Sequence, residues 1–134
     1  MNDLIYLDIE TEKRNQFLDI TPDVLKIIAD SGVDEGTVEL FVPHTTAAIT
    51  INENADPSVK SDMISYLEKL IPQNGQFRHA EGNSDAHIKS SLIGTKLSIF
   101  ISGGELVLGT WQGIYFCEFD GPRSRKLILK IKGD

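Results

Sequence analysis

Several residue types on which whole protein classes depend are scarce in this 134-residue chain. It contains one cysteine, Cys117, so it can form neither an internal disulfide nor a cysteine-rich metal site. No apolar run approaches the roughly 20 residues that span a bilayer, which excludes a transmembrane protein. Residues 1–10 also lack the basic and apolar regions of a secretory signal. We therefore expect a protein of the reducing cytoplasm that does not bind membranes.

Basic residues are also few, with 13 Lys and Arg against 20 Asp and Glu, for a net charge of −7. Residues 1–50 hold 3 basic and 10 acidic side chains, and residues 51–134 hold 10 of each. Since neither part is basic, we expect no nucleic-acid partner. One local basic cluster could instead hold a phosphorylated small molecule; its members are Arg123, Arg125, Lys126, Lys130 and Lys132.

The length and the residue patterns predict a single α+β domain over residues 1–134. Apolar alternation predicts about eight strands, the first two paired as a hairpin. Two helices are expected, one starting at Thr21-Pro22 and ending at Gly32, and one capped by Asp56 and closed by Pro72. Residues 73–87 have no periodicity and are interpreted as a long polar loop. Without alternating strands and helices, the sheet should be antiparallel.

The three histidines are the main functional signal, because none lies in an apolar stripe. His44 follows a strand that ends at Pro43, and His79 and His87 fall in the polar loop. Neutral imidazole is the commonest metal ligand, and three imidazoles with one open position are typical of a catalytic zinc site. Their spacing matches no metal motif, so three unrelated surface histidines are the alternative. Asp85 is a candidate further ligand, orienting group or solvated carboxylate.

A second candidate group lies near the C-terminus. Glu118 and Asp120 share one face of a predicted strand, close to the guanidinium of Arg123. Two carboxylates in that position are either an acid/base pair or partners in a structural ion pair. The neighbouring Cys117 is interpreted as a buried small apolar residue rather than a nucleophile.

These segments, taken together, resemble the YjbQ family, which is also described as a family of secondary thiamine-phosphate synthases. The resemblance covers essentially the whole chain. It rests on five motifs in matching order, FVPHTTAA at 41–48, NEN at 52–54, HAEGNSDAH at 79–87, GTWQGIY at 109–115 and EFDGPR at 118–123.

The resemblance implies an α+β fold with a sandwich-like antiparallel sheet and two helices. It also implies a homotrimer whose pocket contains His44, His79 and His87. The chemistry of the residues adds that these histidines could hold a divalent ion, zinc or magnesium, with Arg123 nearby, and that Glu118 or Asp85 could act as the catalytic base.

The implied reaction couples a pyrimidine pyrophosphate to a thiazole phosphate and releases pyrophosphate. Two alternatives remain open. One is a metal-dependent hydrolase or lyase of another small phosphorylated or carbonyl compound, and the other is a non-catalytic module that binds a metal or a small molecule.

Overall fold

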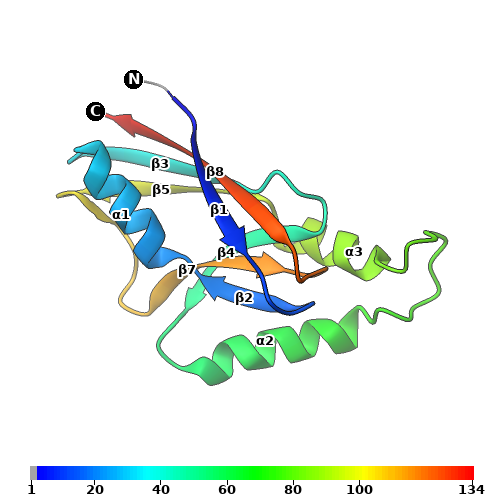
Figure 1. Ribbon diagram of the computed structural model, residues 1–134. Coiled ribbons are helices and arrows are strands. Elements are labelled where there is room, and N and C mark those ends of the chain that lie inside the picture. Colours follow the sequence, from blue (N-terminus) through cyan, green and yellow to red (C-terminus); the bar gives the residue numbers. More distant parts are fainter. Residues whose placement is uncertain (1–2) are drawn as a thin grey trace.

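The computed structural model describes residues 3–134, whose strands form two antiparallel sheets (Figure 1). The larger sheet has the strand order β1-β8-β3-β5-β6, with β1 (Ile5–Glu10), β8 (Ser124–Gly133), β3 (Gly36–Phe41), β5 (Lys96–Ser102) and β6 (Glu105–Leu106). The smaller sheet has the order β2-β7-β4, with β2 (Gln16–Asp19), β7 (Gln112–Glu118) and β4 (Ala47–Glu53). The antiparallel sheet predicted from the sequence is confirmed.

The main hydrophobic core lies between the two sheets. Alternate residues of β8, such as Leu127 and Leu129, are fully buried and pack in one cluster with Ile49 and Phe116 of the smaller sheet. Because side chains of a strand alternate between its two faces, the other face of the larger sheet points outward, where it exposes both polar and large apolar side chains. The sandwich-like α+β fold is therefore confirmed.

Helix α1 (Thr21–Ser31) adds Val24 and Ile28 to this core and ends at Gly32, as expected. Gly32 adopts a left-handed conformation with a φ of 72°, which a glycine reaches without a steric penalty.

The second face of the smaller sheet is covered by helices α2 (Pro57–Leu70) and α3 (Ser84–Ile93) (Figure 1). Phe17, Tyr115 and Cys117 form a second apolar cluster there, with Met63 and Leu67 of α2 packed against it. Asp56 caps α2 as predicted, since its carboxylate accepts the Ser58 amide proton at 2.9 Å. The predicted burial of Cys117 is confirmed as well.

Helix α3 corrects the prediction of two helices and of a loop over residues 73–87. Its buried residues are Asp85, Ala86, Lys89 and Ser90, so three of the four are polar. A charged pair, Asp85 and Lys89, takes the inward positions that apolar residues normally fill. Hydrophobic periodicity therefore gave no sign of this helix.

The predicted hairpin of the first two strands is also wrong. β1 pairs with β8 in the larger sheet, and β2 pairs with β7 in the smaller one. The intervening residues carry the chain from one sheet to the other. Across the described residues, no helix has the length and apolar character needed to cross a membrane.

Candidate functional site

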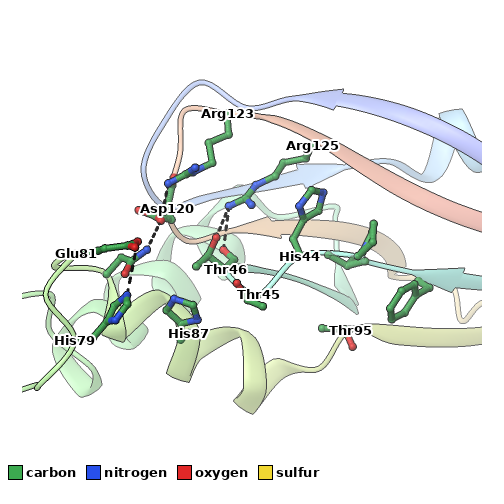
Figure 2. A pocket seen from close by; sticks show the side chains of 14 residues that line it. His44, Thr45, Thr46, His79, Glu81, His87, Thr95, Asp120, Arg123 and Arg125 are labelled. Carbon is green, nitrogen blue, oxygen red and sulfur yellow. Dashed lines mark hydrogen bonds and ion pairs between the residues drawn. The ribbon is translucent and has the colours of Figure 1, made fainter.

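A pocket of about 840 Å³ opens where the two sheets meet the start of α3 (Figure 2). Its walls come from four segments that are separate in sequence. They are the connection from β3 to β4, the stretch that leads into the first turns of α3, the connection from α3 to β5, and the start of β8 with the turn before it. The polar side chains that line it are His44, Thr45, Thr46, His79, Glu81, Asn83, His87, Thr95, Asp120, Arg123 and Arg125. Four of the six residues proposed from the sequence are in this set.

The three histidines line this one pocket although up to 43 positions separate them in the chain. The segment that carries His44 is tied to the end of α3, because the Val42 amide donates to the Thr95 carbonyl at 2.8 Å. The rings of His79 and His87 meet edge to face with centroids 5.4 Å apart. Figure 2 shows both rings at the α3 side of the pocket and His44 at the sheet side.

The protonation state of His44 follows from its contacts. Its Nε2 accepts the backbone N–H of Lys126 at 3.0 Å, so the single proton of the neutral ring is on Nδ1. Burial and the positive charge of Arg125 lower the pKa of His44 below its ordinary value. His44 is therefore a neutral hydrogen-bond donor at neutral pH.

These contacts do not fit the expected three-histidine metal centre. Nε2 of His44 is already engaged with the Lys126 amide, which leaves only Nδ1 for a ligand. Within residues 3–134, no three His, Cys, Asp or Glu side chains are grouped so that they could hold one ion. A bound divalent ion stays a prediction of the sequence.

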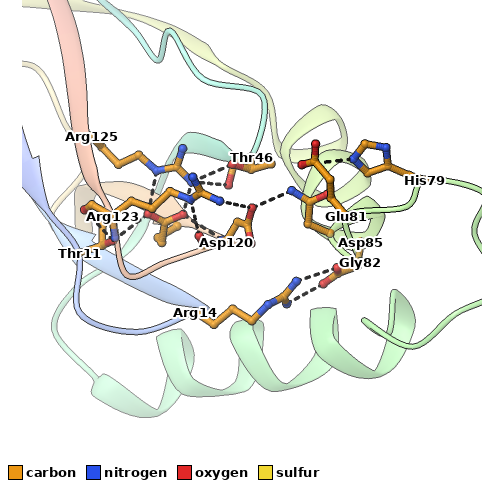
Figure 3. A network of polar contacts seen from close by, with 12 residues as sticks. Thr11, Arg14, Thr46, His79, Glu81, Gly82, Asp85, Asp120, Arg123 and Arg125 are labelled. Carbon is orange, nitrogen blue, oxygen red and sulfur yellow. Dashed lines mark hydrogen bonds and ion pairs between the residues drawn. The ribbon is translucent and has the colours of Figure 1, made fainter.

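Arg125 is the most deeply buried cation that lines the pocket, with 5% of its surface exposed. Its Nε donates to Glu118 Oε1 at 2.8 Å, and its Nη2 bonds to Glu118 Oε2 and to Thr46 Oγ1 (Figure 3). Among the described residues, no acceptor takes the protons of its second amine, Nη1. This amine remains available to a ligand in the pocket.

Glu118 is bound on both carboxylate oxygens. Besides Arg125, its Oε1 accepts the Thr11 hydroxyl at 2.8 Å and its Oε2 accepts the Asp120 amide at 2.9 Å. Its side chain is fully buried, and it is not among the residues that line the pocket. The arrangement is the structural ion pair that the sequence left open as one alternative, with Arg125 rather than Arg123 as the partner.

Arg123 lies at the pocket rim, with about half of its side chain exposed. Its Nη2 donates to Asp120 Oδ2 at 2.9 Å, and the same oxygen accepts the side-chain amide of Asn83 at 2.8 Å. Asp120 thus joins the β7–β8 turn to the N-terminus of α3 (Figure 3).

Asp85 lies outside the pocket and is completely buried. Arg14 donates to both of its oxygens at 2.9 Å, and Lys89 donates to one of them at 3.0 Å. Burial opposes ionisation of Asp85, but the hydrogen bonds from Arg14 and Lys89 outweigh it, so its pKa is below the ordinary value. The sequence proposed Asp85 as a ligand or base, whereas its contacts hold α3, and with it His87, against the β1–β2 segment.

Sequence reasoning did not place Asn83 or Thr46 in the site, and it named Arg125 only as a member of the basic cluster that could hold a phosphorylated small molecule, without a partner. A signal for Arg125 was available, because it precedes Leu127, Leu129 and Ile131 on the inward face of β8. A charged residue on an apolar face requires a buried partner, and that partner is Glu118.

Comparison with known proteins places the whole chain in one family. The model for UPF0047 protein YjbQ-like proteins matches residues 5–134. UPF0047 protein MJ1081 of Methanocaldococcus jannaschii is 57% identical over 98% of this chain and 95% of its own. UPF0047 protein YugU of Bacillus subtilis is 48% identical over 95% of this chain and 97% of its own.

Two solved structures share the fold. A YjbQ/UPF0047 family protein from Clostridium acetobutylicum has a TM-score of 0.93 and 54% identity, covering 96% of this chain and 99% of that one. A Sulfolobus solfataricus protein, described as YbjQ-like and of unknown function, has a TM-score of 0.91 and 30% identity over the full length of both chains.

These relatives correct the expected activity. They are described as UPF0047 proteins, as uncharacterised or as of unknown function, and none of these descriptions names thiamine-phosphate synthesis. Because the described residues also lack a metal-binding group, neither the synthase nor the metal-dependent alternatives are retained. Sequence and fold agree across the whole length, and the chain belongs to the YjbQ (UPF0047) family.

Proposed function

We propose that this protein is an acid–base enzyme that binds a small phosphate-bearing substrate in the histidine-lined pocket. The observation that carries the proposal is the free Nη1 amine of Arg125, on a side chain that lines the pocket and is only 5% exposed. A guanidinium that is fixed in this way costs little further conformational entropy when it binds an anion.

Three donors surround the sheet side of the pocket. Arg125 offers Nη1, Arg123 offers the amine protons that Asp120 does not take, and His44 offers its Nδ1 proton. The charges of Arg125 and Arg123 are balanced by Glu118 and Asp120. Recognition of the anion therefore depends on directed hydrogen bonds more than on net charge, which favours a phosphate with several acceptor oxygens.

The α3 side of the pocket supplies groups that can transfer protons. His79 and His87 are in ring contact, and His79 Nε2 lies 3.7 Å from the Glu81 carboxylate. Imidazole is the usual general acid or base because its ordinary pKa lies near neutrality. A substrate whose phosphate lies at the sheet side would present its adjoining carbons and oxygens to these two rings.

The binding step can be tested by isothermal titration calorimetry with inorganic phosphate and pyrophosphate at constant ionic strength. We expect saturable binding of one ion per pocket, weakened about 10-fold or more by Arg123→Gln, since a hydrogen bond to a charged group contributes about 1.5–3 kcal/mol. Lys130→Gln is the matched control, because it removes the same charge from a strand position outside this pocket. Equal weakening in both variants would show nonspecific attraction and overturn the proposal.

The chemical step can be tested by proton NMR in deuterated water with a panel of sugar phosphates and phosphorylated hydroxy acids. Acid–base chemistry should exchange a carbon-bound proton of a compound that binds, and His87→Gln should abolish the exchange while phosphate still binds. If no bound compound exchanges or reacts, the pocket is not an acid–base site.

A further inference from the structure

One stretch of the pocket wall is apolar and has no part in the proposed function. Three of the residues that line the pocket are apolar, and they are consecutive in the chain, namely Phe41, Val42 and Pro43. A phosphate fills only a small part of a pocket of about 840 Å³, which has room for a small organic molecule. The organic part of the ligand, rather than its phosphate, is therefore what this stretch can contact.

The apolar stretch lies at the end of the pocket that is remote from Arg123. The Val42 amide donates to the Thr95 carbonyl at 2.8 Å, so this stretch and Thr95 are neighbours. Figure 2 shows Thr95 at one end of the pocket and Arg123 at the other, with His44 between them. A ligand whose phosphate is held by the two arginines therefore extends past His44 toward the apolar stretch.

Two side chains of this stretch are available for contact. Val42 is buried, whereas Phe41 and Pro43 on either side of it are exposed, because the alternation of β3 continues past the end of the strand. Phe41 is 43% exposed, and its ring is in water when the pocket holds no ligand. Covering such apolar surface is favourable, and neither side chain offers a donor or an acceptor to a polar group.

We infer that the substrate is a phosphate monoester whose organic part is apolar, such as a ring or a branched alkyl group that packs against Phe41 and Pro43. This inference rests on the proposed function, which places the phosphate at Arg123, Arg125 and His44. The phosphate then fixes the position of the substrate, and Phe41 selects its organic part.

The test compares two monoesters that carry the same charge, methyl phosphate and cyclohexyl phosphate. Calorimetry on the full chain should show that cyclohexyl phosphate binds about 10-fold more tightly, since one fully buried methylene corresponds to a ratio of about 4 and the protein covers only one side of the ring. Phe41→Ala should reduce this preference to about 3-fold or less.

Phe100→Ala is the matched control. Phe100 pairs with Thr37 on the same face of the larger sheet as Phe41 and is 69% exposed, but it lies outside the pocket. This variant should therefore keep the preference for cyclohexyl phosphate.

A second measurement needs no variant. In the unmodified protein, nuclear Overhauser effects should connect the cyclohexyl protons of the bound ester with the ring protons of Phe41, and not with those of Phe100.

The outcomes separate the two proposals. If neither monoester binds, the proposed function fails and this inference fails with it. If both bind equally, if Phe41→Ala keeps the preference, or if Phe100→Ala loses it as well, the apolar inference is overturned while the phosphate site stands. Overhauser effects that do not reach Phe41 overturn it in the same way.

Discussion

Replacing Glu118 by Gln keeps the shape of a fully buried side chain but removes its charge. Arg125 stays positively charged, because a guanidinium does not release its proton in proteins. With only 5% of the residue exposed, water cannot hydrate this charge in place of the lost carboxylate. The substitution also weakens the acceptors for Thr11 Oγ1 and for the Asp120 amide. The perturbation therefore tests whether this ion pair holds the start of β8 against β7.

Removal of one partner of a buried ion pair typically costs about 3–5 kcal/mol. That is a large part of the roughly 5–15 kcal/mol by which a domain is stable. For a chain of this length, about 1 kcal/mol lowers the melting temperature by about 4 °C, so we expect a decrease of about 12–20 °C.

The assay is thermal unfolding, with urea unfolding as a second measurement, both followed by circular dichroism at one fixed protein concentration. Asp30→Asn is the control, because Asp30 pairs with Lys26 at 3.5 Å on the surface and such pairs contribute about 1 kcal/mol or less. A double variant, Glu118→Gln with Arg125→Met, should regain part of the lost stability, because no unpaired charge remains. A loss for Glu118→Gln no larger than the control, with an unchanged denaturant slope, would refute this account.

Four further outcomes are expected. Asp56→Ala should lower the melting temperature slightly and leave phosphate binding intact, because Asp56 caps α2 outside the pocket; lost binding at unchanged stability would contradict this. Ionised Asp85 has a lowered pKa, so its contribution to stability is complete above the unfolded value of about 3.9 and disappears as the pH falls through its folded value. Acid unfolding monitored by circular dichroism should therefore be less steep in Asp85→Asn. Burial raises the pKa of the Cys117 thiol, so a thiol reagent should label it only after unfolding, and rapid labelling of the native protein would show that it is accessible. Sedimentation equilibrium should give three times the 14.9 kDa mass of one chain, and a monomer mass at micromolar concentration would remove the predicted homotrimer.

Local signals in the sequence determined much of the secondary structure. The Asp56-Pro57 start and the apolar stripe that follows it define α2, and Gly32 marks the end of α1 within one residue. Alternation along β8 marks which of its residues face the core. These features depend on neighbours within a few positions, and sequence patterns record such neighbours directly.

Only the tertiary structure decided the partners of the charged residues. Asp85 and Glu118 have the side chains of catalytic acids, yet Arg14, 71 positions away, and Arg125 occupy their oxygens. Helix α3 was not predicted because the Asp85–Lys89 ion pair, rather than apolar side chains, occupies its inward face.

Local sequence patterns could not predict the contacts in the pocket either. The histidine placements suggested a site, but the Lys126 amide on Nε2 makes His44 a proton donor rather than a ready metal ligand. The side-chain amide of Asn83 donates to Asp120, 37 positions away. Hydrogen bonds over such separations depend on how the two sheets and α3 pack together, and no periodicity along the chain encodes them.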